Sequence, residues 1–128
     1  MSNAISVERR RFNVGARLRS FRHAASGIGL MMRTQHNAWI HLAATIFVCG
    51  LGFWLHVAAA DWRWLVVAML LVWVAEAINT SFEHLCDVVS PEFHASVQRS
   101  KDIAAGAVLI CAVGTTILGF LTFLPYLG

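Results

Sequence analysis

The sequence Glu76-Ala-Ile-Asn79-Thr-Ser-Phe-Glu83-His-Leu-Cys-Asp87 directly follows an uninterrupted apolar run, residues 64–75. Its polar side chains Glu76, Asn79, Glu83 and Asp87 are three, four and four positions apart, so a helix would place them on one face. We call these four residues the polar stripe. Carboxylates that continue a helix of membrane-grade hydropathy are costly in lipid, and they usually face a bundle interior or a water-filled site. The stripe therefore predicts a functional site on a membrane helix.

The composition agrees with a membrane protein. Of the 128 residues, 58% are hydrophobic and only 13% are charged, which is too apolar for an ordinary soluble domain of this size. The apolar stretches 42–60 and 103–128 are long enough to cross a bilayer, which takes about 20 residues. The stretch 64–75 spans only if Glu76 and Glu83 lie inside the helix near one membrane face. The sequence predicts one all-α integral membrane domain (residues 1–128) with membrane helices over 38–60, 63–88 and 103–127.

Basic residues gather near the N-terminus. Seven of the ten lysines and arginines precede Trp39, against Glu8 alone. The positive-inside bias then places the N-terminus in the cytoplasm. With three spans, the 60–63 turn lies outside, the 88–102 loop lies inside, and the C-terminus lies outside.

Two further helical segments are expected. Residues 12–34 mix arginines with apolar side chains, which predicts a basic amphipathic helix on the cytoplasmic membrane surface. Ser90-Pro91-Glu92 suits a helix start with proline at the first position, which predicts a short helix leading from Pro91 into the third span.

Three membrane helices would not easily surround four polar side chains. The cost of desolvating the polar stripe therefore predicts a homo-oligomer in which a second copy buries it.

Several chemistries remain open from the residues alone. Carboxylates at a membrane edge suit Mg²⁺ and phosphate oxygens, or a proton acceptor, and Lys101 could neutralise phosphate charge. These are parts of a phosphoryl transferase, although the sequence has neither GxxxxGK[ST] nor GxGxxG. A small transporter or ion-conducting oligomer is the alternative, and a catalytically silent scaffold is a third. The other two spans offer only threonines as polar groups besides histidines at the ends of the first, so the acidic site is one-sided and favours interfacial chemistry.

The run EAINTSFEHLCDVVSPEFHASVQRSKDIAAGAVLI, residues 76–110, resembles the bacterial diacylglycerol kinase and undecaprenol kinase family. It fits the pattern E-x-x-N-[ST]-x-x-E-x-x-x-D, a short loop, then K-D-x-x-[AS]-[AG]-A-V. The resemblance extends back to Asn37 and His41, and to the segment 20–24 with Gly27, so it covers nearly the whole chain.

This resemblance implies a small three-span homotrimer in the bacterial cytoplasmic (inner) membrane, with active sites between subunits at the cytoplasmic interface. Such a protein uses ATP and Mg²⁺ to phosphorylate the hydroxyl of a membrane lipid, diacylglycerol or undecaprenol. Its partners are the lipid, ATP and its own copies, with no nucleic acid. The stretches 76–84 and 90–94, running into 101–109, are closer to the undecaprenol kinase branch, while diacylglycerol remains open.

The resemblance also implies roles for individual residues. Glu76 is the catalytic base, Asn79 supports substrate and phosphate geometry, and Asp87 has a structural or supporting role. Glu83 is a metal ligand at the ATP phosphates, and Lys101 binds those phosphates. The residues implied at the nucleotide are His23, Glu83, Glu92, Phe93, His94, Lys101 and Asp102.

One position departs from the family pattern. The family usually has a glutamate, its second metal ligand, two residues before the asparagine that corresponds to Asn37; here that position is Gln35. A glutamine carbonyl can ligate Mg²⁺ but brings no charge. His36 or Asn37 could compensate, and a subgroup with altered metal handling is the other interpretation.

Overall fold

The protein is seen here as a computed structural model that describes residues 12–128. The arginines at positions 9–11, which contribute to the predicted basic N-terminus, lie outside the described residues. The elements, in chain order, are α1 (Val14–Thr34), α2 (His36–Trp54), α3 (Ala59–Val89), α4 (Ala95–Phe123) and a short 3₁₀ helix η1 (Leu124–Tyr126). The described part of the chain contains no strand, so the all-helical prediction is confirmed.

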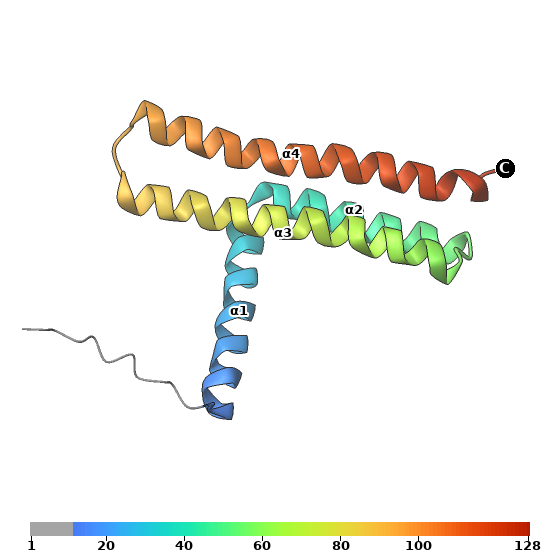
Figure 1. Ribbon diagram of the computed structural model, residues 1–128, viewed down its shortest axis with the longest axis horizontal. Coiled ribbons are helices and arrows are strands. Elements are labelled where there is room, and N and C mark those ends of the chain that lie inside the picture. Colours follow the sequence, from blue (N-terminus) through green and yellow to red (C-terminus); the bar gives the residue numbers. More distant parts are fainter. Residues whose placement is uncertain (1–11) are drawn as a thin grey trace, which may run out of the picture.

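Three of these helices are long and apolar enough to cross a membrane, namely α2, α3 and the continuous segment Ala95–Tyr126. They run alongside one another, whereas α1 stands crosswise to them (Figure 1). Many large apolar side chains on them are exposed, among them Ile46, Leu70 and Ile110. Exposure of this extent suits contact with lipid and not with water. The predicted class, an integral membrane protein with three apolar helices, is therefore confirmed.

A helix also forms over most of the range predicted for the surface helix. Asn13 caps α1, because its side-chain oxygen accepts a hydrogen bond from the Ala16 amide at 3.3 Å. The helix ends at Gln35, whose backbone is extended (φ −111°, ψ 117°). This single extended residue separates α1 from α2 and lets the chain change direction between them (Figure 1).

The first turn of the membrane bundle lies earlier than predicted. Helix α2 ends at Trp54, and the chain reverses at 55–58, where His56 adopts a left-handed backbone (φ 53°). The segment 60–63, predicted to be the turn, instead lies in the first two turns of α3. Asp61 stands in the first turn of this helix, where a carboxylate interacts favourably with the helix dipole.

The predicted helix that leads from Pro91 into the third span forms, but it starts later than Pro91. Residues 90–94 are not helical, and α4 begins at Ala95. His94 caps it, because the Nδ1 atom accepts a hydrogen bond from the Ser96 amide at 3.2 Å. This cap starts α4 eight residues before the predicted span at 103, and the helix then continues unbroken to Phe123.

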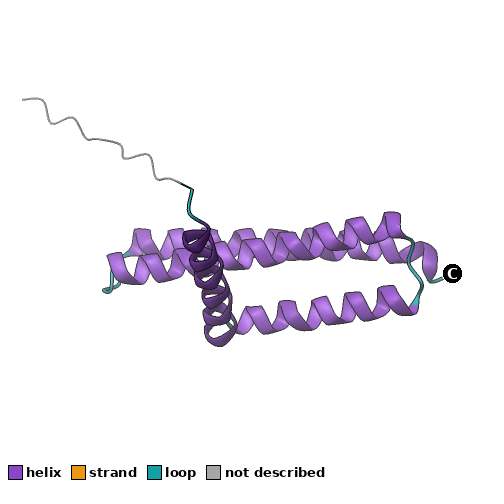
Figure 2. Ribbon diagram, turned by 90° about the horizontal axis from the view of Figure 1, so that it is seen from below, coloured by secondary structure: helices purple, strands orange, loops and turns teal. Residues whose placement is uncertain are grey.

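Packing within the chain is uneven. Helices α3 and α4 have the most extensive contact, and α2 touches α3 less (Figure 2). A cavity of about 500 Å³ lies between α2, α3 and α4, with His41 and Val72 in its lining along with Phe120. At the end remote from α1, the Tyr126 hydroxyl donates to Asp61 and accepts from the Ala58 amide. The C-terminus is thereby fastened to the turn between α2 and α3.

Candidate active site

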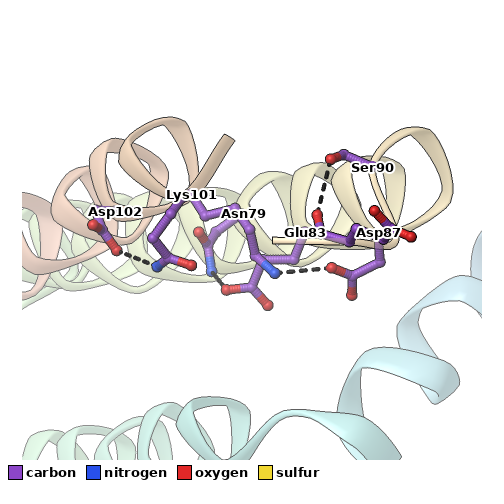
Figure 3. A network of polar contacts seen from close by, with 8 residues as sticks. Asn79, Glu83, Asp87, Ser90, Lys101 and Asp102 are labelled. Atoms are coloured by element: carbon purple, nitrogen blue, oxygen red, sulfur yellow. Dashed lines mark hydrogen bonds and ion pairs between the residues drawn. The ribbon is translucent and has the colours of Figure 1, made fainter. Parts of the chain in front are cut away.

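The polar stripe changes from fully buried to exposed along α3. Glu76 is 0% exposed and Asn79 is 4% exposed, Glu83 is half-buried, and Asp87 is exposed. The Asn79 side-chain amide donates to Glu83 Oε1 at 3.3 Å, so these two residues share a face as predicted (Figure 3). The stripe therefore leads from a dry interior to the open cytoplasm-facing end predicted for α3.

This burial corrects one expectation. The sequence predicts that a second copy is needed to bury the stripe, but the single chain already buries Glu76 and Asn79. Helix α2 contributes to this burial, because His41 Nε2 lies 3.5 Å from Glu76 Oε2. The desolvation cost therefore supports an oligomer only for Glu83 and Asp87.

Glu76 lies in the most unusual environment of the chain. Both carboxylate oxygens are buried without a hydrogen bond, and Asn79 Oδ1 and Thr80 Oγ1 nearby are also buried without one. The nearest ionisable partner is His41 on α2, with Nε2 at 3.5 Å from Glu76 Oε2. Buried polar atoms without partners are rare in folded proteins and call for a specific explanation. The unpartnered atoms cluster on one helix face around Glu76, which makes this position a candidate functional site.

At the exposed end of the stripe, α4 contributes a cation. Lys101 Nζ lies 2.9 Å from Asp87 Oδ1 and joins α4 to α3 (Figure 3). Asp102, the next residue, accepts a hydrogen bond from the Gln98 side chain at 2.9 Å. The structure thus brings Lys101 beside the acidic stripe, and Asp87 is the residue that holds it there.

Other predicted site residues make no bond to this cluster within the described part of the chain. His23 is exposed on α1, and Glu92 and Phe93 are exposed in the loop between α3 and α4. His94 uses Nδ1 to cap α4. Gln35 is half-buried between α1 and α2, and its side chain does not cap α2. Within residues 12–128, none of these five side chains has a hydrogen bond or ion pair to the polar stripe.

The acidic donors suit a metal ion that arrives with phosphate. The described residues hold no cluster of three or more His, Cys, Asp or Glu side chains that could enclose a metal ion. Mg²⁺ needs no such cage, because it is commonly bound through one or two carboxylates together with substrate phosphates and water. Glu83 supplies a half-buried carboxylate with one oxygen outside its bond to Asn79, and Gln35 offers a carbonyl.

The sequence did not predict that His41 lies beside Glu76. It resembles a polar residue near a helix end, and its pairing with Glu76 depends on how α2 packs against α3. One signal exists in the spacing, because His41 and Thr45 lie one helical turn apart on an otherwise apolar stretch. The structure joins both to α3, with the Trp73 indole N–H donating to Thr45 Oγ1 at 2.9 Å.

Comparison with known proteins identifies the family of this chain. The family described as prokaryotic diacylglycerol kinase matches residues 22–123. An undecaprenol kinase of Bacillus subtilis is 36% identical over 109 residues, which cover 85% of this chain and 89% of the relative. A diacylglycerol kinase of Synechocystis is 35% identical over 107 residues, covering 83% of this chain and 61% of the relative. A diacylglycerol kinase of Escherichia coli K12 is 27% identical over 100 residues, covering 73% of this chain and 82% of the relative.

The match extends over α2, α3 and α4 and includes the polar stripe and Lys101. These relatives are lipid kinases, for which ATP is the implied co-substrate. With its three apolar helices and buried acidic site, this chain belongs to the prokaryotic diacylglycerol kinase family and is a membrane lipid kinase.

Proposed function

We propose that this protein transfers the γ-phosphoryl group of ATP to the hydroxyl of a membrane lipid alcohol, with Mg²⁺, at the cytoplasmic face of a bacterial inner membrane. The observation that carries the proposal is Glu76, a fully buried carboxylate with both oxygens free of hydrogen bonds, one helical turn from the Asn79–Glu83 pair. A proton acceptor next to a carboxylate that can hold phosphate-bound Mg²⁺ is an arrangement that suits such a transfer.

Glu76 serves as the general base. It accepts the proton of the lipid hydroxyl as the hydroxyl oxygen bonds to the γ-phosphorus, and the bond from that phosphorus to the bridging oxygen of ADP breaks. Water is excluded because the side chain is 0% exposed, which favours transfer to the lipid over hydrolysis of ATP. Asn79, fixed by its bond to Glu83, supports the geometry between base and phosphate.

The exposed end of the stripe binds the nucleotide. Glu83 and Gln35 would hold Mg²⁺, which when bound neutralises charge on the phosphate oxygens. Lys101 adds a positive charge at the same end, and Asp87 holds its ammonium group at 2.9 Å. The remaining nucleotide contacts that we propose are His23, Glu92, Phe93, His94 and Asp102.

Charge distribution supports the orientation. Arginines of α1 and residues 99–101 carry most of the cationic charge, and they fall at the end of the bundle that holds the polar stripe. By the positive-inside bias this end faces the cytoplasm, where ATP is present, and the C-terminus faces outward. Helix α1, crosswise to the bundle, would then lie in the cytoplasmic interface with its exposed Phe21 and Ile28 toward lipid (Figure 1).

The test is phosphate transfer by the purified full-length chain in mixed micelles, with diacylglycerol and undecaprenol offered in parallel. We expect ATP-dependent phosphorylation of at least one lipid that is lost when Mg²⁺ is chelated. The relatives' names place both lipids within the family, and the undecaprenol kinase shows 36% identity, so undecaprenol is the first substrate to try. No transfer to either lipid by folded protein would contradict the proposal and favour a catalytically silent member of the fold.

A further inference from the structure

The contact between His41 and Glu76 has not yet been given a role, although Glu76 itself is proposed as the base. His41 Nε2 and both Glu76 oxygens are buried atoms without hydrogen bonds, and they face each other across the contact between α2 and α3. The two side chains are 11% and 0% exposed. Among residues 12–128, His41 is the one basic side chain within 4.0 Å of the Glu76 carboxylate.

Trp73 contacts the histidine ring and also bonds to the helical turn that carries it. The His41 ring lies edge-on to Trp73, with ring centroids 6.2 Å apart and planes at 67°. The Trp73 N–H donates to Thr45 Oγ1, and that hydroxyl in turn donates to the His41 carbonyl oxygen at 2.8 Å. The bond from the Trp73 indole to Thr45 therefore holds α2 against α3, whereas the imidazole itself is restrained by the edge-on Trp73 ring.

The two carboxylate oxygens are placed differently. Oε2 is the atom 3.5 Å from His41 Nε2, whereas Oε1 has no partner. A separation of 3.5 Å is longer than a normal hydrogen bond, but catalytic contacts are often long before substrate binds and shorten in the complex. An imidazole with its proton on Nε2 can donate to Oε2 and leave Oε1 to accept the lipid proton.

We propose that His41 is a positioning residue for Glu76, whose Nε2–H orients the carboxylate through Oε2 so that Oε1 is directed at the lipid hydroxyl. The inference rests on the proposed function, in which Glu76 is the base. His41 itself neither gains nor loses a proton in the transfer.

The kinetic test compares two substitutions of different chemistry. His41→Phe keeps a ring of similar size but has no donor, and we expect kcat to fall about 100-fold, since small misplacement of a catalytic group costs that much. The KM for MgATP should stay within about threefold, because the nucleotide site lies at the other end of the stripe. His41→Gln retains an N–H donor, and we expect it to recover kcat to within about tenfold of wild type.

Thr45→Val is the matched control, because it removes the Trp73 bond one turn away but leaves the His41–Glu76 pair. We expect it to lower the thermal unfolding midpoint while kcat stays within about threefold. A loss of kcat in Thr45→Val as large as in His41→Phe would mean that packing between α2 and α3 matters and the pair does not. Failure of His41→Gln to exceed His41→Phe would also overturn the proposal.

A second readout does not depend on kinase activity. Thermal unfolding in micelles would be compared for wild type, His41→Phe, Glu76→Gln and the double variant. Removing one member of a buried pair leaves the other uncompensated, so Glu76→Gln should be more favourable in the His41→Phe background than in wild type. The same shift in both backgrounds would overturn the pairing. If wild type transfers no phosphate, the proposed function fails, and this cycle still decides whether the pair exists.

Discussion

At the scale of single residues, Glu76 and Glu83 lie on one helix face but in different environments. Glu76 is fully buried beside His41, whereas Glu83 is half-buried and bonded to Asn79. A buried carboxylate without hydrogen bonds is suited to accept a proton, whereas a partly hydrated carboxylate can bind a cation that carries phosphate. The two are separated by less than two helical turns.

Glu76→Gln and Glu83→Gln should therefore fail in different ways. We expect Glu76→Gln to lower kcat by at least about 100-fold, because the base is lost, while nucleotide binding stays largely intact. Glu83→Gln should abolish turnover by weakening binding of MgATP. Steady-state kinetics and binding of a fluorescent ATP analogue would separate the two, and near-normal turnover in either variant would remove the role assigned to that residue.

Gln35 gives a prediction about the metal. Restoring a charge with Gln35→Glu should lower the Mg²⁺ concentration needed for half-maximal rate, because a carboxylate binds a hard cation better than a neutral carbonyl does. The measurement is a Mg²⁺ titration at fixed ATP. An unchanged requirement in Gln35→Glu would mean that position 35 does not ligate metal.

The sequence predicted the polar stripe but not its partner. Glu76, Asn79 and Glu83 are close in the chain, and helical spacing alone predicts their common face. His41 is distant in sequence from Glu76 and meets it only through the packing of α2 on α3. A contact between residues so far apart in the chain cannot be predicted from a single sequence.

At the scale of elements, the ends of helices depended on caps and turns that hydropathy does not reveal. The third apolar stretch was predicted from residue 103, but α4 starts at Ala95 because the His94 imidazole caps it. The polar residues 96–102 lower the hydropathy of this first part without ending the helix. Likewise Asp61 was predicted to lie in a turn, but its carboxylate interacts favourably with the helix dipole in the first turn of α3.

The approach of α2 to α3 gives a prediction about stability. A Cβ atom on Gly52 would lie 2.7 Å from the Trp62 ring, whereas one on Gly50 would meet nothing within 4 Å. Trp62 is restrained by Phe53, with ring centroids 4.9 Å apart. We expect Gly52→Ala to destabilise the chain by about 1–3 kcal/mol through overpacking.

Gly50→Ala is the matched control and should be neutral or stabilising by up to about 1 kcal/mol, since alanine favours a helix over glycine. Thermal unfolding in detergent micelles measures both. Equal midpoints for the two variants would contradict the close contact between Gly52 and Trp62.

At the scale of the whole molecule, one end of the polar stripe is buried within the chain and the other end is exposed. The single chain buries Glu76, but Asp87 is exposed and Glu83 is only half-covered. Exposed apolar side chains on the membrane helices do not by themselves indicate an oligomer, because lipid is as apolar as they are. The open end of the stripe leaves Glu83 and Asp87 accessible to a second copy, and the trimer stays a prediction.

The molecular mass of the oligomer can be measured directly. We expect sedimentation equilibrium in density-matched detergent to give the mass of three chains of 14.1 kDa each. In the functional control, subunits carrying Glu76→Gln are co-assembled with wild-type subunits, and the kinase activity of the mixed oligomer is measured. A fully active single chain of 14.1 kDa would contradict the trimer and show that one chain forms the whole site.

The most direct test of the central claim is the rate of phosphate transfer from ATP to undecaprenol in mixed micelles, measured for wild type and for Glu76→Gln at saturating Mg²⁺. We predict phosphorylated lipid with wild type and at least about a 100-fold lower rate with Glu76→Gln at similar helical content. Equal rates for the two proteins would contradict the assignment of the buried carboxylate as the base of a lipid kinase.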